Sequence, residues 1–210
     1  MTRNKIFSDY TFWLLIATNV YLLLYYLKFP DSINDLIIIF WIQSVLIGIF
    51  NFLDMLTLKN FAVDNSAPVK QTLGSNISGG KGCFPLFFLF HYGAFHLVYA
   101  FFLVTLVDIK KLDFRFIELS FFIILFGCIV NFVQNKIRNR TEDVNIGAMF
   151  FLPYARVIPM HLMILLPKFF NISGAAIFLV LKTLADVIMY FVYTKALFKP
   201  PEKATEELAG

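Results

Sequence analysis

DLIIIFWIQSVLIGIFNFLDM, residues 35–55, is the stretch of sequence that decides the fold. Its two carboxylates stand at or near the ends, and its middle holds one amide, Gln43, among mostly apolar side chains. An α-helix rises about 1.5 Å per residue, so about 20 residues cross the roughly 30 Å of hydrocarbon in a bilayer. Inside a bilayer a segment must pair its own backbone groups, and the sequence has no alternating apolar pattern of about ten residues. Residues 35–55 therefore predict a transmembrane helix.

Five other apolar runs of similar length predict transmembrane helices by the same argument. They are residues 10–27, 85–107, 116–132, 149–166 and 174–196. Apolar residues make up 59% of the chain and charged residues only 15%, and the mean hydropathy of +0.74 lies above the usual range of soluble domains. We therefore predict an all-α, polytopic transmembrane helix bundle with six spans, which forms one domain over residues 1–210.

Two segments outside these spans are polar. Residues 58–84 contain Asn, Ser, Pro and Gly, a composition typical of a flexible loop. Residues 198–210 begin near two prolines and continue with Glu and Lys, as a fraying polar tail would. We expect a flexible cytoplasmic loop at 58–84 and a polar tail at 198–210.

The Lys and Arg residues of the connections predict the orientation. One side of the membrane holds most of them, namely Arg3, Lys5, Lys59, Lys70, Lys81, Lys136, Arg138, Arg140, Lys195, Lys199 and Lys203. The other side holds Lys28, Lys110, Lys111, Arg115 and Lys168. By the positive-inside rule both termini are cytoplasmic.

The expected location is the inner (plasma) membrane of a bacterium. The 27 Phe, with many Ile, Asn and Lys, are typical of an AT-rich bacterial genome. The expected surroundings are the lipid bilayer and either a membrane-protein partner or a second copy of the chain. We expect no nucleic-acid partner.

Ionisable residues inside the predicted spans are the candidates for a functional site. Such a group at membrane depth costs several kcal/mol unless it is paired or faces a wet cavity, so these residues are expected to converge on one buried site. Six such residues stand out, namely His91 and His96 in one span, Arg156 and His161 in another, and Lys182 and Asp186 in a third.

Helix geometry separates the two histidines of residues 85–107. His91 and His96 are about 140° apart on an α-helix, so they cannot both point at one site unless the helix is distorted. His96 shares a stripe with Tyr92 and Tyr99 instead. Gly93 is expected to let a neighbouring helix approach closely. We place His91 in the polar site and treat His96 and Tyr99 as secondary candidates.

The last two spans supply the rest of the site. Lys182 and Asp186 are four residues apart and therefore share a helix face. Arg156 stands between two prolines that interrupt the helix, and His161 lies deeper. The predicted polar site is therefore His91, Arg156, His161, Lys182 and Asp186. In residues 35–55, Gln43, Asn51 and the secondary candidate Asp54 are further acceptors.

Four members of this site, His91, Arg156, Lys182 and Asp186, also have a structural interpretation, whereas His161 lies too deep to reach the interface and must have a partner. A buried His91 can be a neutral ring that binds one neighbour. Arg156 lies near enough to the cytoplasmic end of its span to reach that interface. Lys182 and Asp186 can form a self-neutralising pair that only sets helix packing.

Three motifs stand in the second half of the chain, namely His91-Tyr92-Gly93, Arg156 followed by His161-Leu162, and Leu181-Lys182-Thr183 with Asp186. In these motifs the chain resembles a family of small prokaryotic integral membrane proteins of unknown function. In that family a second histidine tends to stand eight residues after the first, a position that holds Tyr99 here. The resemblance implies a six-helix fold and a shared polar site, and it implies no activity.

Two classes of function follow from the sequence. In the first, the buried site binds or translocates a small ion, a proton or a metal, with His91, His161 and Asp186 as candidate metal ligands. In the second, the protein is a noncatalytic membrane subunit that docks on a larger inner-membrane complex. No catalytic residue is assigned, and the sequence identifies no cofactor. An enzyme is less favoured than either of these two classes.

Two enzyme or cofactor variants remain as alternatives. A zinc site would need His91, His96 and His161 together with Asp186 and a distorted helix. A haem between two helices would need His161 and either His91 or His96 as axial ligands.

Overall fold

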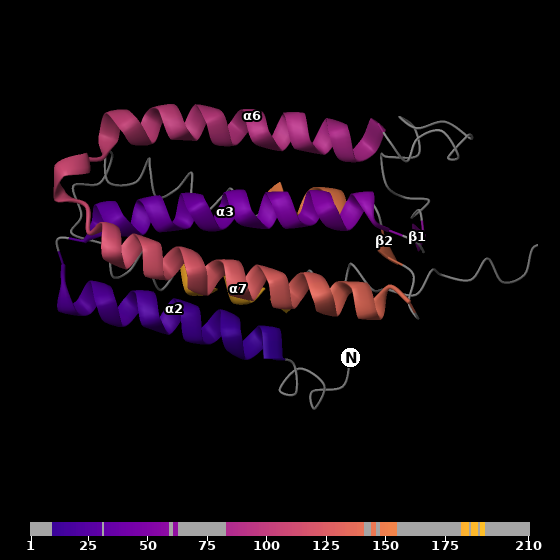
Figure 1. Ribbon diagram of the computed structural model, residues 1–210, viewed down its shortest axis with the longest axis horizontal. Helices are drawn as coiled ribbons and strands as arrows, with labels where there is room; N and C mark the ends of the chain where they lie inside the picture. Colours follow the sequence, from indigo (N-terminus) through magenta and orange to yellow (C-terminus); the bar gives the residue numbers. More distant parts are fainter. Residues whose placement is uncertain are drawn as a thin grey trace, which may run out of the picture.

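Four long helices run side by side in the computed structural model of the chain (Figure 1). They are α2 (Tyr10–Lys28), α3 (Ile33–Leu56), α6 (Cys83–Leu106) and α7 (Phe114–Arg138). The structure describes residues 10–30, 32–58, 61–62, 83–140, 144–145, 148–154, 182–184, 186–188 and 190–191. All four helices are long and apolar enough to cross a membrane. The all-α class and the first four predicted helices are therefore confirmed.

The helix bounds differ from the apolar runs mainly at α7. The run ends at Phe132, whereas the helix continues to Arg138 through polar residues that include Asn135 and Lys136. Hydropathy marks only the apolar part of a helix, so it misses a polar last turn. At its start, the side chain of Asp113 accepts from the backbone N–H groups of Arg115 and Phe116 and caps the helix.

The remaining predicted elements are described only in part. Residues 148–154 are helical and open the predicted fifth span, and residues 182–184, 186–188 and 190–191 are helical within the sixth. The other residues of those two spans lie outside the described residues. The same holds for most of the predicted loop 58–84 and for the whole predicted tail 198–210.

The four helices form one layer in the order α6, α3, α7, α2 (Figure 1). The α2–α3 turn and the short 3-10 helix η1 (Ile109–Lys111) lie at one end of the layer, which we name the η1 end. At the other end, the strand end, β1 (Phe61–Ala62) pairs in parallel with β2 (Val144–Asn145). Helices α3 and α7 therefore run in the same direction, opposite to α2 and α6.

Helix α3 is the centre of the packing, because it contacts both α6 and α7. On one flank it shares a core with α2 and α7, which includes Leu22, Ile39 and Phe116. On the other flank it shares a core with α6 and residues 148–154, which includes Met55, Phe88, Tyr92, Tyr99 and Phe150. The outward side of α6 carries exposed Phe, Leu and Val side chains, as lipid contact requires.

Candidate functional site

Lys182 and Asp186 form a buried ion pair. They lie one helical turn apart, and Nζ of Lys182 is 2.6 Å from Oδ2 of Asp186. Each residue is only 6% exposed. Buried charges are stable only when paired and hydrogen-bonded, so the partners of this pair determine what it can do.

Helices α2 and α3 supply those partners. Nζ of Lys182 donates to Oδ1 of Asn19 at 3.0 Å and to Oε1 of Gln43 at 2.9 Å. The amide nitrogen of Asn19 donates to Oδ2 of Asp186 at 3.3 Å, so Asn19 contacts both charges. Nζ also lies 4.4 Å from the centre of the Phe40 ring. We name these five residues the lysine site.

Asn19 is the polar member of the lysine site that the sequence analysis missed. It is 2% exposed and sits in the middle of α2. It also donates to the backbone oxygen of Leu15, but its partners in the ion pair are 163 and 167 positions away along the chain. A signal did exist, because an amide in the centre of an apolar run of about 20 residues needs a polar partner in the membrane.

His91 lies apart from the lysine site. Its side chain is exposed, its Nδ1 is 2.8 Å from the hydroxyl of Tyr154, and its ring stacks on Phe87. In Figure 1, α6 stands at one side of the layer and α2, which binds Asp186, at the other. The structure therefore corrects the expectation that His91 joins the pair: the inward stripe of α6 runs through residues 88, 92, 96 and 99, and His91 is off that stripe.

His96 occupies the buried position on α6, at 5% exposure. Its Nδ1 carries a hydrogen, because it lies 2.9 Å from the backbone oxygen of Tyr92, which can only accept. Its Nε2 is 2.8 Å from Oγ of Ser44 on α3. The Tyr92 hydroxyl lies 3.0 Å from the same Oγ and donates to the backbone oxygen of Ser44 at 3.1 Å. We name His96, Ser44 and Tyr92 the histidine site.

Tyr99, the other secondary candidate on α6, belongs to the core beside the histidine site. It is 6% exposed, and its ring centre lies 6.3 Å from that of His96. The close helix approach that the sequence predicted at Gly93 occurs at Gly48 of α3 instead. A Cβ at Gly48 would overlap the Tyr92 ring, whereas one at Gly93 would meet no described atom within 4 Å.

The lysine site and the histidine site meet on α3. Gln43 binds Lys182, and the next residue, Ser44, binds His96. Successive residues of an α-helix point about 100° apart, so the two side chains leave α3 toward different neighbours. Two polar groups of one helical turn therefore hold both buried networks at the middle of the layer.

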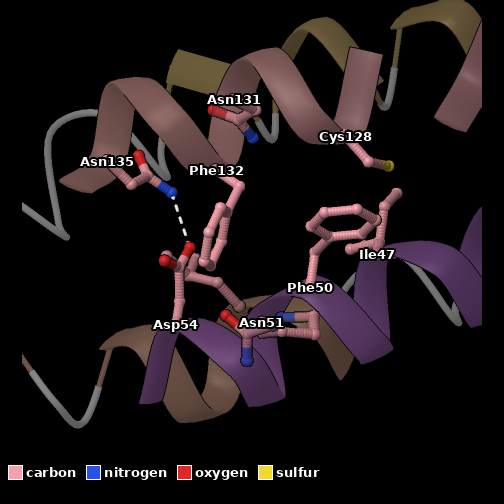
Figure 2. A pocket seen from close by; sticks show the side chains of 10 residues that line it. Ile47, Phe50, Asn51, Asp54, Cys128, Asn131, Phe132 and Asn135 are labelled. Atoms are coloured by element: carbon pink, nitrogen blue, oxygen red, sulfur yellow. Dashed lines mark hydrogen bonds between the residues drawn. The ribbon is translucent and has the colours of Figure 1, made fainter. Parts of the chain in front are cut away.

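Asp54 forms a third polar group at the strand end. Its Oδ2 accepts from the amide of Asn135 at 3.0 Å, and its Oδ1 lies 3.2 Å from Nζ of Lys136. Beside it lies a cavity of about 50 Å³ between α3, α7 and residues 152–153 (Figure 2). We name Asp54, Asn135 and Lys136 the aspartate site.

Arg156 and His161 lie outside the described residues. Within the described part of the chain, no group of three or more His, Cys, Asp or Glu side chains is placed to hold a metal ion. The zinc and haem alternatives both require His161, so they remain predictions.

The model of a family of unknown function, DUF6498, matches residues 1–203. The chain belongs to this family. No curated protein and no solved structure matches the chain. The predicted resemblance to an uncharacterised family is thus confirmed at that level, and the function has to be argued from the site.

Proposed function

We propose that this DUF6498 protein is an integral membrane protein that binds a small monovalent cation at the lysine site and translocates it in exchange for the proton of Lys182. One observation carries the proposal: three oxygen atoms from three elements surround the buried Nζ of Lys182. They are Oδ2 of Asp186 at 2.6 Å, Oε1 of Gln43 at 2.9 Å and Oδ1 of Asn19 at 3.0 Å.

The chemistry of this cage suits an alkali cation. Such hard cations prefer carboxylate and carbonyl oxygens, and the lysine site supplies one carboxylate and two amide oxygens. The ring of Phe40 adds a face that attracts positive charge. The ammonium group of Lys182 thus fills a position that a free cation would occupy.

Exchange at this position conserves charge. Asp186 and the protonated Lys182 together are neutral. When an N–H bond of the ammonium breaks and the proton passes to water, Lys182 becomes neutral and a monovalent cation can take its place beside Asp186. The site is neutral in both states, so neither state leaves an uncompensated charge in the membrane. Lysine can release its proton in a buried site, whereas arginine effectively cannot.

The membrane arrangement is part of the proposal. We place six spans in the inner membrane of a bacterium, with both termini and the strand end on the cytoplasmic side. The cations of the connections support this orientation, because Lys136 and Arg138 close α7 at the strand end. Arg156 and His161 are proposed to line the cytoplasmic approach to the lysine site.

Flux through purified protein in lipid vesicles tests the proposal. The full chain is reconstituted with a pH-sensitive dye inside, and Na⁺, K⁺ or Li⁺ is added outside with choline as the reference ion. The expected result is a rise in internal pH with at least one alkali cation, since each entering cation releases a proton outward. Lys182→Gln with Asp186→Asn removes both charges without leaving one unpaired, and this double variant should lose the response.

Asp108→Asn is the matched control. Asp108 also pairs with a lysine, Lys111, at 3.9 Å, but that pair is on the surface at the η1 end. Its variant should transport like the natural protein. A natural protein that moves no proton with any alkali cation, or a double variant that still does, contradicts the proposal.

A second candidate is a noncatalytic membrane subunit. The observation that favours it is the satisfaction of Lys182, whose three N–H donors match three acceptor oxygens. A network of that kind can serve helix packing alone. Gentle purification from native membranes distinguishes the two, because a stoichiometric protein partner combined with no ion response would favour the subunit.

A further inference from the structure

The cavity at the aspartate site is a second place where oxygen atoms gather. Its volume of about 50 Å³ is enough for a few water molecules. Asn51 and Asp54 line it from α3, and Cys128, Asn131 and Asn135 line it from α7 (Figure 2). A polar cavity of this size among apolar helices requires an occupant that can bind its polar groups.

Asn51 offers its side-chain oxygen, Oδ1, to a species in this cavity. Its amide nitrogen donates to the backbone oxygen of Met149 at 3.0 Å and is turned away from the cavity (Figure 2). A backbone oxygen can only accept, so the assignment of nitrogen and oxygen in this amide is fixed. Asn51 is 5% exposed, and among the described residues its Oδ1 has no hydrogen-bond partner. Among the described residues the one side-chain oxygen that is both fully buried and without a partner is Oγ of Ser120, so Oδ1 of Asn51 opens on the cavity that its residue lines. A bound species in that cavity would give this acceptor a partner.

Asp54 gives the cavity its charge. The residue is 4% exposed, and Asn135 uses its amide nitrogen on Asp54, which again fixes that amide. Lys136 approaches from outside: it does not line the cavity, and its side chain is 28% exposed. Each oxygen of Asp54 has one partner and can accept a further contact, whereas the amide nitrogens of Asn51 and Asn135 each already use one N–H on an oxygen.

We propose that this cavity binds a small monovalent cation, Na⁺ or K⁺, through Asp54 and the side-chain oxygen of Asn51, together with one or more waters. A single carboxylate that is shared with Lys136 provides too little charge to strip water from a divalent ion. Asn131, an exposed residue without a hydrogen-bond partner among those described, can turn its amide oxygen toward the ion. The site stands independently of transport at the lysine site.

Cys128 supplies a reporter inside the cavity. In a Cys83→Ser chain it is the only thiol, because the sequence has two cysteines. The reaction rates of Cys128 with a positively charged and a neutral methanethiosulfonate reagent are measured in NaCl, KCl and choline chloride at equal ionic strength. The ratio of the two rates removes the effect of thiol ionisation, because both reagents need the thiolate.

A bound cation should lower the ratio of the rate with the positively charged reagent to the rate with the neutral reagent. The effect should saturate as the cation concentration rises. We expect a fall of about tenfold in Na⁺ or K⁺ relative to choline, which equals about 1.4 kcal/mol of repulsion between ion and reagent. Asp54→Asn should abolish the fall. Asp35→Asn, the same change at the opposite end of α3, should retain it. Lys136→Gln should shift saturation to about tenfold lower cation concentration, because a competing charge is removed.

Three outcomes overturn the inference. The first is a ratio that is equal in all three salts, and the second is a fall that persists in Asp54→Asn. The third, in the same measurement with MgCl₂ and CaCl₂ at equal ionic strength, is a response to Mg²⁺ or Ca²⁺ alone. The Lys182→Gln, Asp186→Asn double variant should still show the cation response of Cys128, so failure at the lysine site and failure at this cavity are distinguishable.

Discussion

The two buried aspartates that pair with lysine differ in what surrounds the lysine. In the lysine site, the side chains of Lys182 and Asp186 are 7% and 9% exposed, and the atoms are 2.6 Å apart. In the aspartate site, Asp54 is equally buried at 5%, but Lys136 is 28% exposed and 3.2 Å away. Protein oxygens therefore solvate Lys182, whereas water reaches Lys136. The same two residue types form a pair enclosed by protein side chains at the middle of the layer and a pair open to water at its end.

Removal of Asp186 is expected to have the largest effect on stability. Asp186→Ala leaves Lys182 as an unpaired buried cation and should cost about 3–5 kcal/mol of unfolding free energy. Lys182→Met in the same chain should recover most of that loss. Thermal unfolding of the purified protein in detergent measures both. Equal stability of the single and double variants would show that the pair carries no buried charge.

The close approach of α3 and α6 is expected to be the next most sensitive feature. In Gly48→Ala the new Cβ would lie 2.7 Å from Cδ1 of Tyr92 and closer still to Cε1. The ring cannot easily move away, because its hydroxyl is bonded to Ser44. We expect a loss of about 1–3 kcal/mol in the same unfolding measurement.

Gly93→Ala is the matched control for this change. An added Cβ at Gly93 meets no described atom within 4 Å. The variant should keep its stability or gain slightly, because alanine favours a helix over glycine. If both glycine variants lost the same stability, the contact between Gly48 and Tyr92 would not be what fixes α3 against α6.

Removal of Lys136 should cost much less than removal of Asp186. Lys136→Ala leaves Asp54 with its hydrogen bond from Asn135, and water can replace the partly exposed ammonium group. A loss of about 1 kcal/mol is expected, the upper end for exposed ion pairs, because Asp54 is buried but water reaches Lys136. A loss as large as that of Asp186→Ala would mean that the two pairs are equally enclosed.

The smallest expected effect concerns pH at the η1 end. Backbone hydrogen bonds from Phe116 and Arg115 and the hydroxyl of Tyr25 hold the pKa of Asp113 below its ordinary value. Because the folded pKa is the lower one, the stabilisation is present above the unfolded pKa. It is lost as the pH falls through the folded value, below about pH 4.

The Asp113 effect should stay under about 1 kcal/mol, because the carboxylate is exposed and screened. Asp113→Asn keeps a good cap and removes the titration, so its unfolding temperature should change less between pH 5 and pH 3 than that of the natural protein. An identical change in both proteins would exclude Asp113 as the source.

Helix existence was predictable from the sequence, while the choice of inward face was not. Residues 35–55 predicted a helix that spans Ile33–Leu56, because a long apolar run has few alternatives in a bilayer. The four-residue spacing likewise predicted the contact of Lys182 with Asp186. On α6, spacing separated His91 from His96 but could not decide which one faces α3. That decision depends on Gly48 and Ser44, which belong to another helix.

Long-range partners were also beyond the sequence. Asn19 is one polar residue in an apolar helix, and nothing local indicates that it contacts Lys182 and Asp186. Gln43 was expected as an acceptor because it interrupts residues 35–55, and it does bind Lys182. A single amide in a membrane helix thus predicts that its side chain has a polar partner. Only the packing of the helices determines which residue that partner is.

The neighbouring positions of Gln43 and Ser44 give α3 a mechanical property. Both side chains are fixed to one rigid helical turn, so a rotation of α3 about its long axis displaces the acceptor of Lys182 and the partner of His96 by the same angle. The contact of Gly48 with Tyr92 resists such a rotation one turn further along. The two buried networks are therefore coupled: a rotation of α3 that breaks the hydrogen bonds of one network also strains those of the other.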